Sequence, residues 1–148
     1  MRDGLILAST LGAATGIRST AGLATLALGP PTTHARGTRS RLLRGALGAA
    51  FLAEVLADKL VTLPSRIDAS PLAGRALLGA AAAAAAARRT AESKLAAAVV
   101  GSATAVGTAW LATAGRSAAR GRGVPDVLPA LVEDATVIAL GAAARRRL

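Results

Sequence analysis

The chain contains no cysteine and only one histidine, His34. The lack of cysteine excludes disulfides and thiol chemistry, and it also excludes zinc sites built from cysteine and histidine. His34 lies in a segment rich in proline and arginine, and no serine and aspartate around it suggest a catalytic triad. The sequence has no phosphate-binding glycine loop either. We therefore expect a protein that is not an enzyme and that carries no cofactor and no metal.

Aromatic residues make up only 1% of the chain, although 53% of it is hydrophobic. Soluble cores normally gain much of their buried area from large aromatic side chains. Here the apolar residues are mainly alanine, leucine, valine and glycine, and small residues of this kind favour closely packed helices in lipid. A mean hydropathy of +0.49 is too high for a disordered polar chain. The composition predicts an all-α bundle in a membrane.

Acidic residues are also scarce, with 8 against 18 lysines and arginines, which leaves a net charge of +10. A basic excess can indicate nucleic-acid binding, because it neutralises phosphates. In this chain, however, most cations lie in groups between the apolar runs. The groups are Arg36, Arg39, Arg41 and Arg44; Arg88, Arg89 and Lys94; Arg116, Arg120 and Arg122; and Arg145, Arg146 and Arg147. This pattern favours contact with the anionic headgroups of a lipid bilayer, and we expect no nucleic-acid partner.

Five apolar segments follow one another, at about residues 4–28, 42–63, 71–87, 95–114 and 126–144. Each is close to the roughly 20 residues that cross a hydrocarbon core. The third is the shortest and ends in a weakly hydrophobic alanine run, which fits a short or re-entrant helix. Glycine and proline separate the segments. We predict a single integral membrane domain, residues 1–148, that is a small polytopic transmembrane bundle of four to five helices.

The positions of lysine and arginine give a weak indication of orientation. With five spans, more cations lie on the side of the C-terminus, and the side richer in lysine and arginine is usually cytoplasmic. This favours an outside N-terminus and a cytoplasmic tail, although a four-span arrangement also fits the sequence. The expected location is the inner (plasma) membrane, which the chain crosses several times.

Small residues recur at every fourth position in three segments, which places them on one helical face where two backbones can approach closely. The first segment has Gly4, Ala8, Gly12, Gly16 and Thr20; the second has Gly45, Ala49, Ala53 and Ala57; and the fourth has Ala97, Gly101, Ala105 and Ala109. We predict that Gly12, Gly16 and Gly101 are helix-packing positions.

Half of the acidic residues lie inside apolar segments, where a charge costs several kcal/mol unless it is paired or hydrated. They are Glu54, Asp58, Glu133 and Asp134. Arg18, near the middle of the first segment, is their natural counter-ion, whereas Lys59 lies closer to a segment end and can extend to the interface. Because Glu133 and Asp134 are adjacent, they point about 100° apart on a helix, and at most one of them faces any single partner.

These ionisable residues permit two interpretations. In the first, Arg18 and the acids form a buried salt-bridge network that fixes the helix order and transports nothing. The chain is then a structural or accessory membrane protein that packs against copies of itself or against a partner membrane protein. In the second, the carboxylates form a pathway that carries protons or coordinates a cation. The chain is then a small oligomeric ion or proton channel or transporter.

An ordered set of motifs extends over nearly the whole chain. It consists of Gly12-x-x-x-Gly16-x-Arg18-Ser19, Glu54-x-x-x-Asp58-Lys59-Leu60, Pro64-Ser65-Arg66, Gly74-Arg75, and Pro125-Asp126 ahead of Glu133-Asp134. The set resembles a family of small bacterial multi-span integral membrane proteins that is classified only as a domain of unknown function. The resemblance implies a helical membrane protein and no particular substrate or activity. In the family pattern, proline directly follows Asp-Lys-Leu, whereas residues 61–63 intervene here, so the resemblance does not fix the end of the second helix.

Overall fold

The computed structural model describes residues 2–29, 38–60, 68–90 and 92–148, without the side chains of residues 2, 38–40, 55 and 57–60. The helices within these residues are α1 (Arg2–Ile17), α2 (Ala21–Leu28), α3 (Thr38–Leu60), α4 (Ala69–Ala86), α5 (Lys94–Gly121) and α6 (Val127–Arg145), with a 3-10 turn, η1 (Ala87–Arg89), after α4. No strand occurs in the described part of the chain. The predicted all-α class is confirmed, whereas the expected number of four to five helices is wrong.

The additional helix arises because the first apolar segment is not one helix. It breaks between α1 and α2, and α2 turns back along α1. Leu26 of α2 thereby joins Leu7 of α1 in one buried cluster. Gly22 permits this close return, since a Cβ at this position would overlap the hydroxyl of Thr15. The N-terminal segment is therefore a helical hairpin, whereas the third segment, for which a short or re-entrant helix is expected, forms one helix, α4, that together with η1 is long and apolar enough to cross a membrane.

The long helix α5 packs against α1 and α4 through small residues. Its buried positions form one stripe, Ala97, Gly101, Ala105 and Ala109. Gly12 and Gly16 of α1 face this stripe, and a Cβ on either glycine would overlap a backbone carbonyl oxygen of α5. Gly79 of α4 approaches the same stripe, because its Cβ would lie 2.7 Å from the carbonyl oxygen of Gly101. Larger residues at these positions would force the three helices apart.

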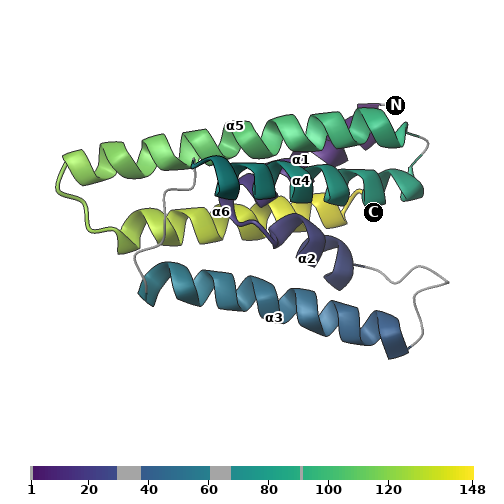
Figure 1. The fold of residues 1–148 in the computed structure, drawn as a ribbon, viewed down its shortest axis with the longest axis horizontal. Coiled ribbons are helices and arrows are strands. Elements are labelled where there is room, and N and C mark those ends of the chain that lie inside the picture. Colours follow the sequence, from purple (N-terminus) through teal and green to yellow (C-terminus); the bar gives the residue numbers. More distant parts are fainter. Residues whose placement is uncertain (1, 30–37, 61–67, 91) are drawn as a thin grey trace.

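Helix α3 lies on the outside of the bundle (Figure 1). Phe51 anchors it, because this side chain packs against a buried cluster that includes Ile17 and Val137. The small-residue stripe of α3 is not used in this contact. Gly45 has open space where a Cβ would stand, and Ala49 and Ala53 are exposed. The stripe of α3 thus faces outward, unlike those of α1 and α5.

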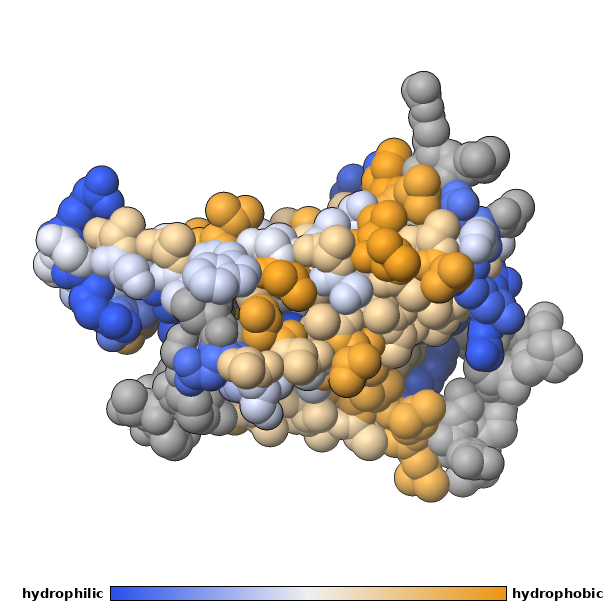
Figure 2. All heavy atoms as spheres, turned by 45° about the horizontal axis from the view of Figure 1, so that its top comes forward, coloured by the Kyte–Doolittle hydropathy of each residue, from blue (hydrophilic) through white to orange (hydrophobic). Residues whose placement is uncertain are grey.

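Among the described residues, three helical stretches are long and apolar enough to cross a membrane: Ala69–Arg89, which joins α4 and η1, then α5 and α6. Only 22% to 28% of their most apolar windows is buried inside the bundle. Leu111 and Ile138 are 73% and 67% exposed, for example. Hydrophobic residues cover much of the middle of the molecule, and hydrophilic residues gather at its two ends (Figure 2). This surface suits apolar surroundings better than water.

Both termini lie at the same end of the bundle (Figure 1). At that end the guanidinium of Arg145, in the last turn of α6, donates a hydrogen bond to the carbonyl oxygen of Leu28. Leu148 packs against the buried cluster that α1, α2, α4 and α6 share. The N-terminal hairpin returns to the end from which it starts, so the arrangement differs from that of five spans with termini at opposite ends.

Candidate functional site

Arg18 directly follows α1 and is 1% exposed, which makes it one of the largest fully buried side chains. Its Nη2 atom lies 2.6 Å from Oδ1 of Asp134 on α6, and its Nε atom donates to the same oxygen at 3.0 Å. The Asp134 side chain is 16% exposed. A charged hydrogen bond of this length is stronger than a neutral one, particularly away from water. The pair ties the break in the N-terminal hairpin to the middle of α6.

Glu54 of α3 binds the backbone at the helix break. One of its carboxylate oxygens accepts a hydrogen bond from the N–H of Ser19 at 2.6 Å. The other accepts from the N–H and the hydroxyl of Thr20, at 3.0 and 2.9 Å. These N–H groups lie at the start of α2, where a helix leaves donors without internal partners and where its dipole favours a negative charge. Glu54 therefore caps α2 from another helix.

Glu133 pairs with a different cation from Asp134. Nε and Nη2 of Arg116 bind the two carboxylate oxygens of Glu133 at 2.7 and 2.8 Å. The Arg116 and Glu133 side chains are 18% and 10% exposed. This two-point contact joins α5 to α6 near the turn that connects them. Adjacent acids on α6 thus face different neighbours, as their angular separation on a helix requires.

The remaining predicted residues, Asp58 and Lys59, lie outside the described side chains, although their backbone belongs to α3. The structure therefore brings Arg18 and Asp134 together directly, places Glu54 beside them at residues 19 and 20, and brings Glu133 to Arg116. Among the described residues, no group of three or more histidine, cysteine or acidic side chains could hold a metal ion.

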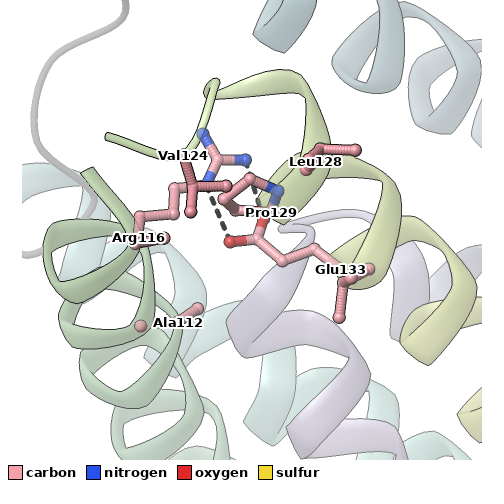
Figure 3. Close-up of a pocket in the computed structure, with 9 residues that line it drawn as sticks. Ala112, Arg116, Val124, Leu128, Pro129 and Glu133 are labelled. Atoms are coloured by element: carbon pink, nitrogen blue, oxygen red, sulfur yellow. Dashed lines mark hydrogen bonds and ion pairs between the residues drawn. The ribbon is translucent and has the colours of Figure 1, made fainter. Parts of the chain in front are cut away.

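A pocket of about 410 Å³ lies between α5 and α6, beside the Arg116–Glu133 pair. Figure 3 shows Ala112, Val124, Leu128 and Pro129 around it, together with the two charged residues. Apart from the ion pair, its lining residues are apolar or glycine. The charged groups bind each other across its edge. The pocket consequently suits an apolar group, such as part of an acyl chain, better than a polar substrate.

Sequence reasoning did not identify Arg116 or the backbone at Ser19 and Thr20 as part of the site. The sequence groups Arg116 with the cations that flank the fourth apolar segment, but α5 continues to Gly121. In a helical hairpin, residues at equal distances from the turn meet. Arg116 and Glu133 lie eight or nine positions on either side of Val124 and Pro125. This symmetry is the sequence signal that would have found the pair.

No family model, curated protein or solved structure matches the chain. The resemblance to the family of small membrane proteins therefore stays a prediction.

Proposed function

We propose that the chain is a multi-pass integral membrane protein of the inner (plasma) membrane with a structural or accessory role. In this proposal, the charged groups hold the N-terminal hairpin inside the bundle and transport nothing. The main support for this proposal is the contact of Arg18, which is 1% exposed, with Asp134. The apolar outer surface supports the membrane location, and the family resemblance agrees with it without supplying an activity.

The state of the acids supports a structural role. Asp134, Glu133 and Glu54 all accept short hydrogen bonds from donors of other helices or of the helix break. A carboxylate that carries protons or ions must exchange its partners during transport. Removing one partner from such a contact leaves a buried charge uncompensated, which is strongly unfavourable. The same contacts therefore oppose exchange and stabilise one helix arrangement.

An accessory protein also needs a surface for a homo-oligomer or a partner membrane protein. The small-residue stripes of α1 and α5 face each other inside the bundle, so they do not serve as that surface. The stripe of α3 remains uncovered at Gly45, Ala49 and Ala53. Small residues of this kind allow a second helix to approach closely in lipid. Helix α3 is therefore the element that we expect to contact another protein.

A small oligomeric ion or proton channel or transporter is the second candidate. The observation that favours it is the broken helix, because transporters often place substrate and ion sites at the ends of such half-helices. Here Glu54 occupies the donors at the start of α2. For transport, this carboxylate would have to give way to the transported ion.

The two candidates differ in ion and proton flux through proteoliposomes that contain the purified protein. Glu54→Gln, Glu133→Gln and Asp134→Asn remove the charges of the network, and Asp126→Asn removes an exposed charge as a control. The structural proposal predicts no flux above protein-free vesicles for any folded form. The transporter would be established if the native protein and Asp126→Asn support flux, whereas folded Glu54→Gln or Asp134→Asn does not.

A further inference from the structure

The end of the bundle that carries both termini has an excess of positive charge. The described chain places eight basic residues there, which are Arg41, Arg44, Arg88, Arg89, Lys94, Arg145, Arg146 and Arg147, with Asp3 and Glu92 as the acids. Most of these basic side chains are exposed. We call this set of residues the basic end.

Several contacts hold the basic end together as one surface. Arg44 donates to the carbonyl oxygen of Gly29 at 3.2 Å, and Arg145 donates to that of Leu28. A Cβ on Gly4 would lie 2.8 Å from Cβ of Glu92, so the start of α1 touches the turn before α5. Beneath these contacts, α1, α2, α4 and α6 share a buried apolar cluster. The cations of four separate segments therefore lie at one level of the bundle.

The opposite end is nearly balanced in charge. Arg116 binds Glu133, and Arg120 lies 3.2 Å from Asp126 in an exposed pair. Arg122 and Asp68 also belong to this end, so its described cations and acids are equal in number. The two ends are separated by the apolar surface of the bundle (Figure 2). An imbalance between the two flanks of an apolar belt is what sets orientation in a membrane.

We propose that the basic end binds the anionic headgroups of the cytoplasmic leaflet, so that both termini lie inside the cell and the α1–α2 hairpin enters from that side. The negative potential of this leaflet attracts lysine and arginine close to its surface. The balanced end has no such attraction. This inference rests on the proposed membrane location, and it adds the orientation and the class of lipid.

The orientation can be measured with single cysteines, because the native chain has none. Ser93→Cys, at the basic end, and Gly121→Cys, at the opposite end, change no charge, and both positions are exposed. A membrane-impermeant maleimide added to whole cells should label Cys at position 121 and should reach position 93 only after the membrane is opened. Labelling of position 93 from outside would overturn the orientation.

The lipid preference can be measured with a fluorophore on the same two positions, in vesicles of equal amounts of phosphatidylcholine and phosphatidylglycerol. Spin-labelled phosphatidylglycerol should quench the fluorophore at position 93 more than spin-labelled phosphatidylcholine does, and salt should reduce the difference. Arg146→Gln with Arg147→Gln should lower this preference about two- to fivefold. Arg120→Gln with Arg122→Gln is the matched control and should leave it unchanged.

Equal quenching by the two lipids at position 93 in the native protein would overturn the headgroup proposal. An equal loss of the preference for phosphatidylglycerol in both double variants would also overturn it. A protein that is extracted without detergent would instead refute the proposed membrane location. Membrane fractionation of the same cells separates these failures.

Discussion

Nη2 of Arg18 lies 2.6 Å from Oδ1 of Asp134, although 116 positions separate the two residues in the chain. The contact joins the end of α1 to α6 at the level where the N-terminal segment reverses direction. Glu54 completes this region from α3, because it accepts the N–H groups of Ser19 and Thr20. Two helices that are distant in sequence, α3 and α6, thus stabilise the break in the N-terminal segment.

The cap that Glu54 provides can be tested separately from its charge. Glu54→Ala leaves two backbone donors without their acceptor, and we expect it to lower the free energy of unfolding by about 1–3 kcal/mol. Glu54→Gln keeps one carbonyl oxygen as an acceptor, so its free energy of unfolding should fall less. Hydrogen exchange at the amides of Ser19 and Thr20 should be faster in Glu54→Ala than in Glu54→Gln. Equal exchange rates in both variants and in the native protein would show that the cap is not formed.

Two glycines of α5 make a matched test of close helix packing. A Cβ at Gly101 would lie 2.5 Å from Cβ of Ala83 on α4, whereas a Cβ at Gly107 has nothing within 4 Å. Gly101→Ala should therefore destabilise the protein by about 1–3 kcal/mol through overpacking. Gly107→Ala should be neutral or stabilise it by up to about 1 kcal/mol, because alanine favours helix. Thermal unfolding in detergent compares the two, and equal effects would contradict the observed packing.

The two ion pairs between α5 and α6 should differ in their contribution to stability. Arg116 and Glu133 are mostly buried, whereas Arg120 and Asp126 are 65% and 61% exposed. Arg116→Gln should cost about 1–3 kcal/mol, since it weakens two hydrogen bonds to a largely buried carboxylate. Arg120→Gln should cost about 0–1 kcal/mol because water screens the exposed pair. The measurement is the order of the two unfolding midpoints. A larger loss of stability for Arg120→Gln than for Arg116→Gln would refute this assignment.

Much of the helical pattern could be predicted from the sequence, since glycine and proline separate apolar runs of suitable length. The predicted segments at 71–87 and 126–144 agree closely with α4 and α6. The break after α1 could not be predicted, because it depends on Glu54, which lies 35 positions after Ser19 in the chain. No proline marks this position. Arg18, Ser19 and Thr20 interrupt the apolar run, but a helix can also contain such residues, and the sequence does not show that a distant carboxylate accepts the N–H groups of Ser19 and Thr20.

The residues of the charge network were predictable as a set, but their partners were not. A charge inside an apolar segment needs compensation, and this selects Arg18 and the acids from the sequence alone. Which acid meets which cation depends on the rotation and crossing of the helices. The adjacent residues Glu133 and Asp134 illustrate this, because they pair with Arg116 on one side and with Arg18 on the other.

A double-mutant cycle on Arg18 and Asp134, measured as the free energy of unfolding in mixed micelles, tests most directly whether this ion pair stabilises the fold. Arg18→Met and Asp134→Leu should each lose about 3–5 kcal/mol, because each leaves the other charge buried without its partner. The double variant should lose much less than the sum of the single losses, since it leaves neither charge behind. Additive losses, or single variants as stable as the native protein, would contradict a structural role for the pair.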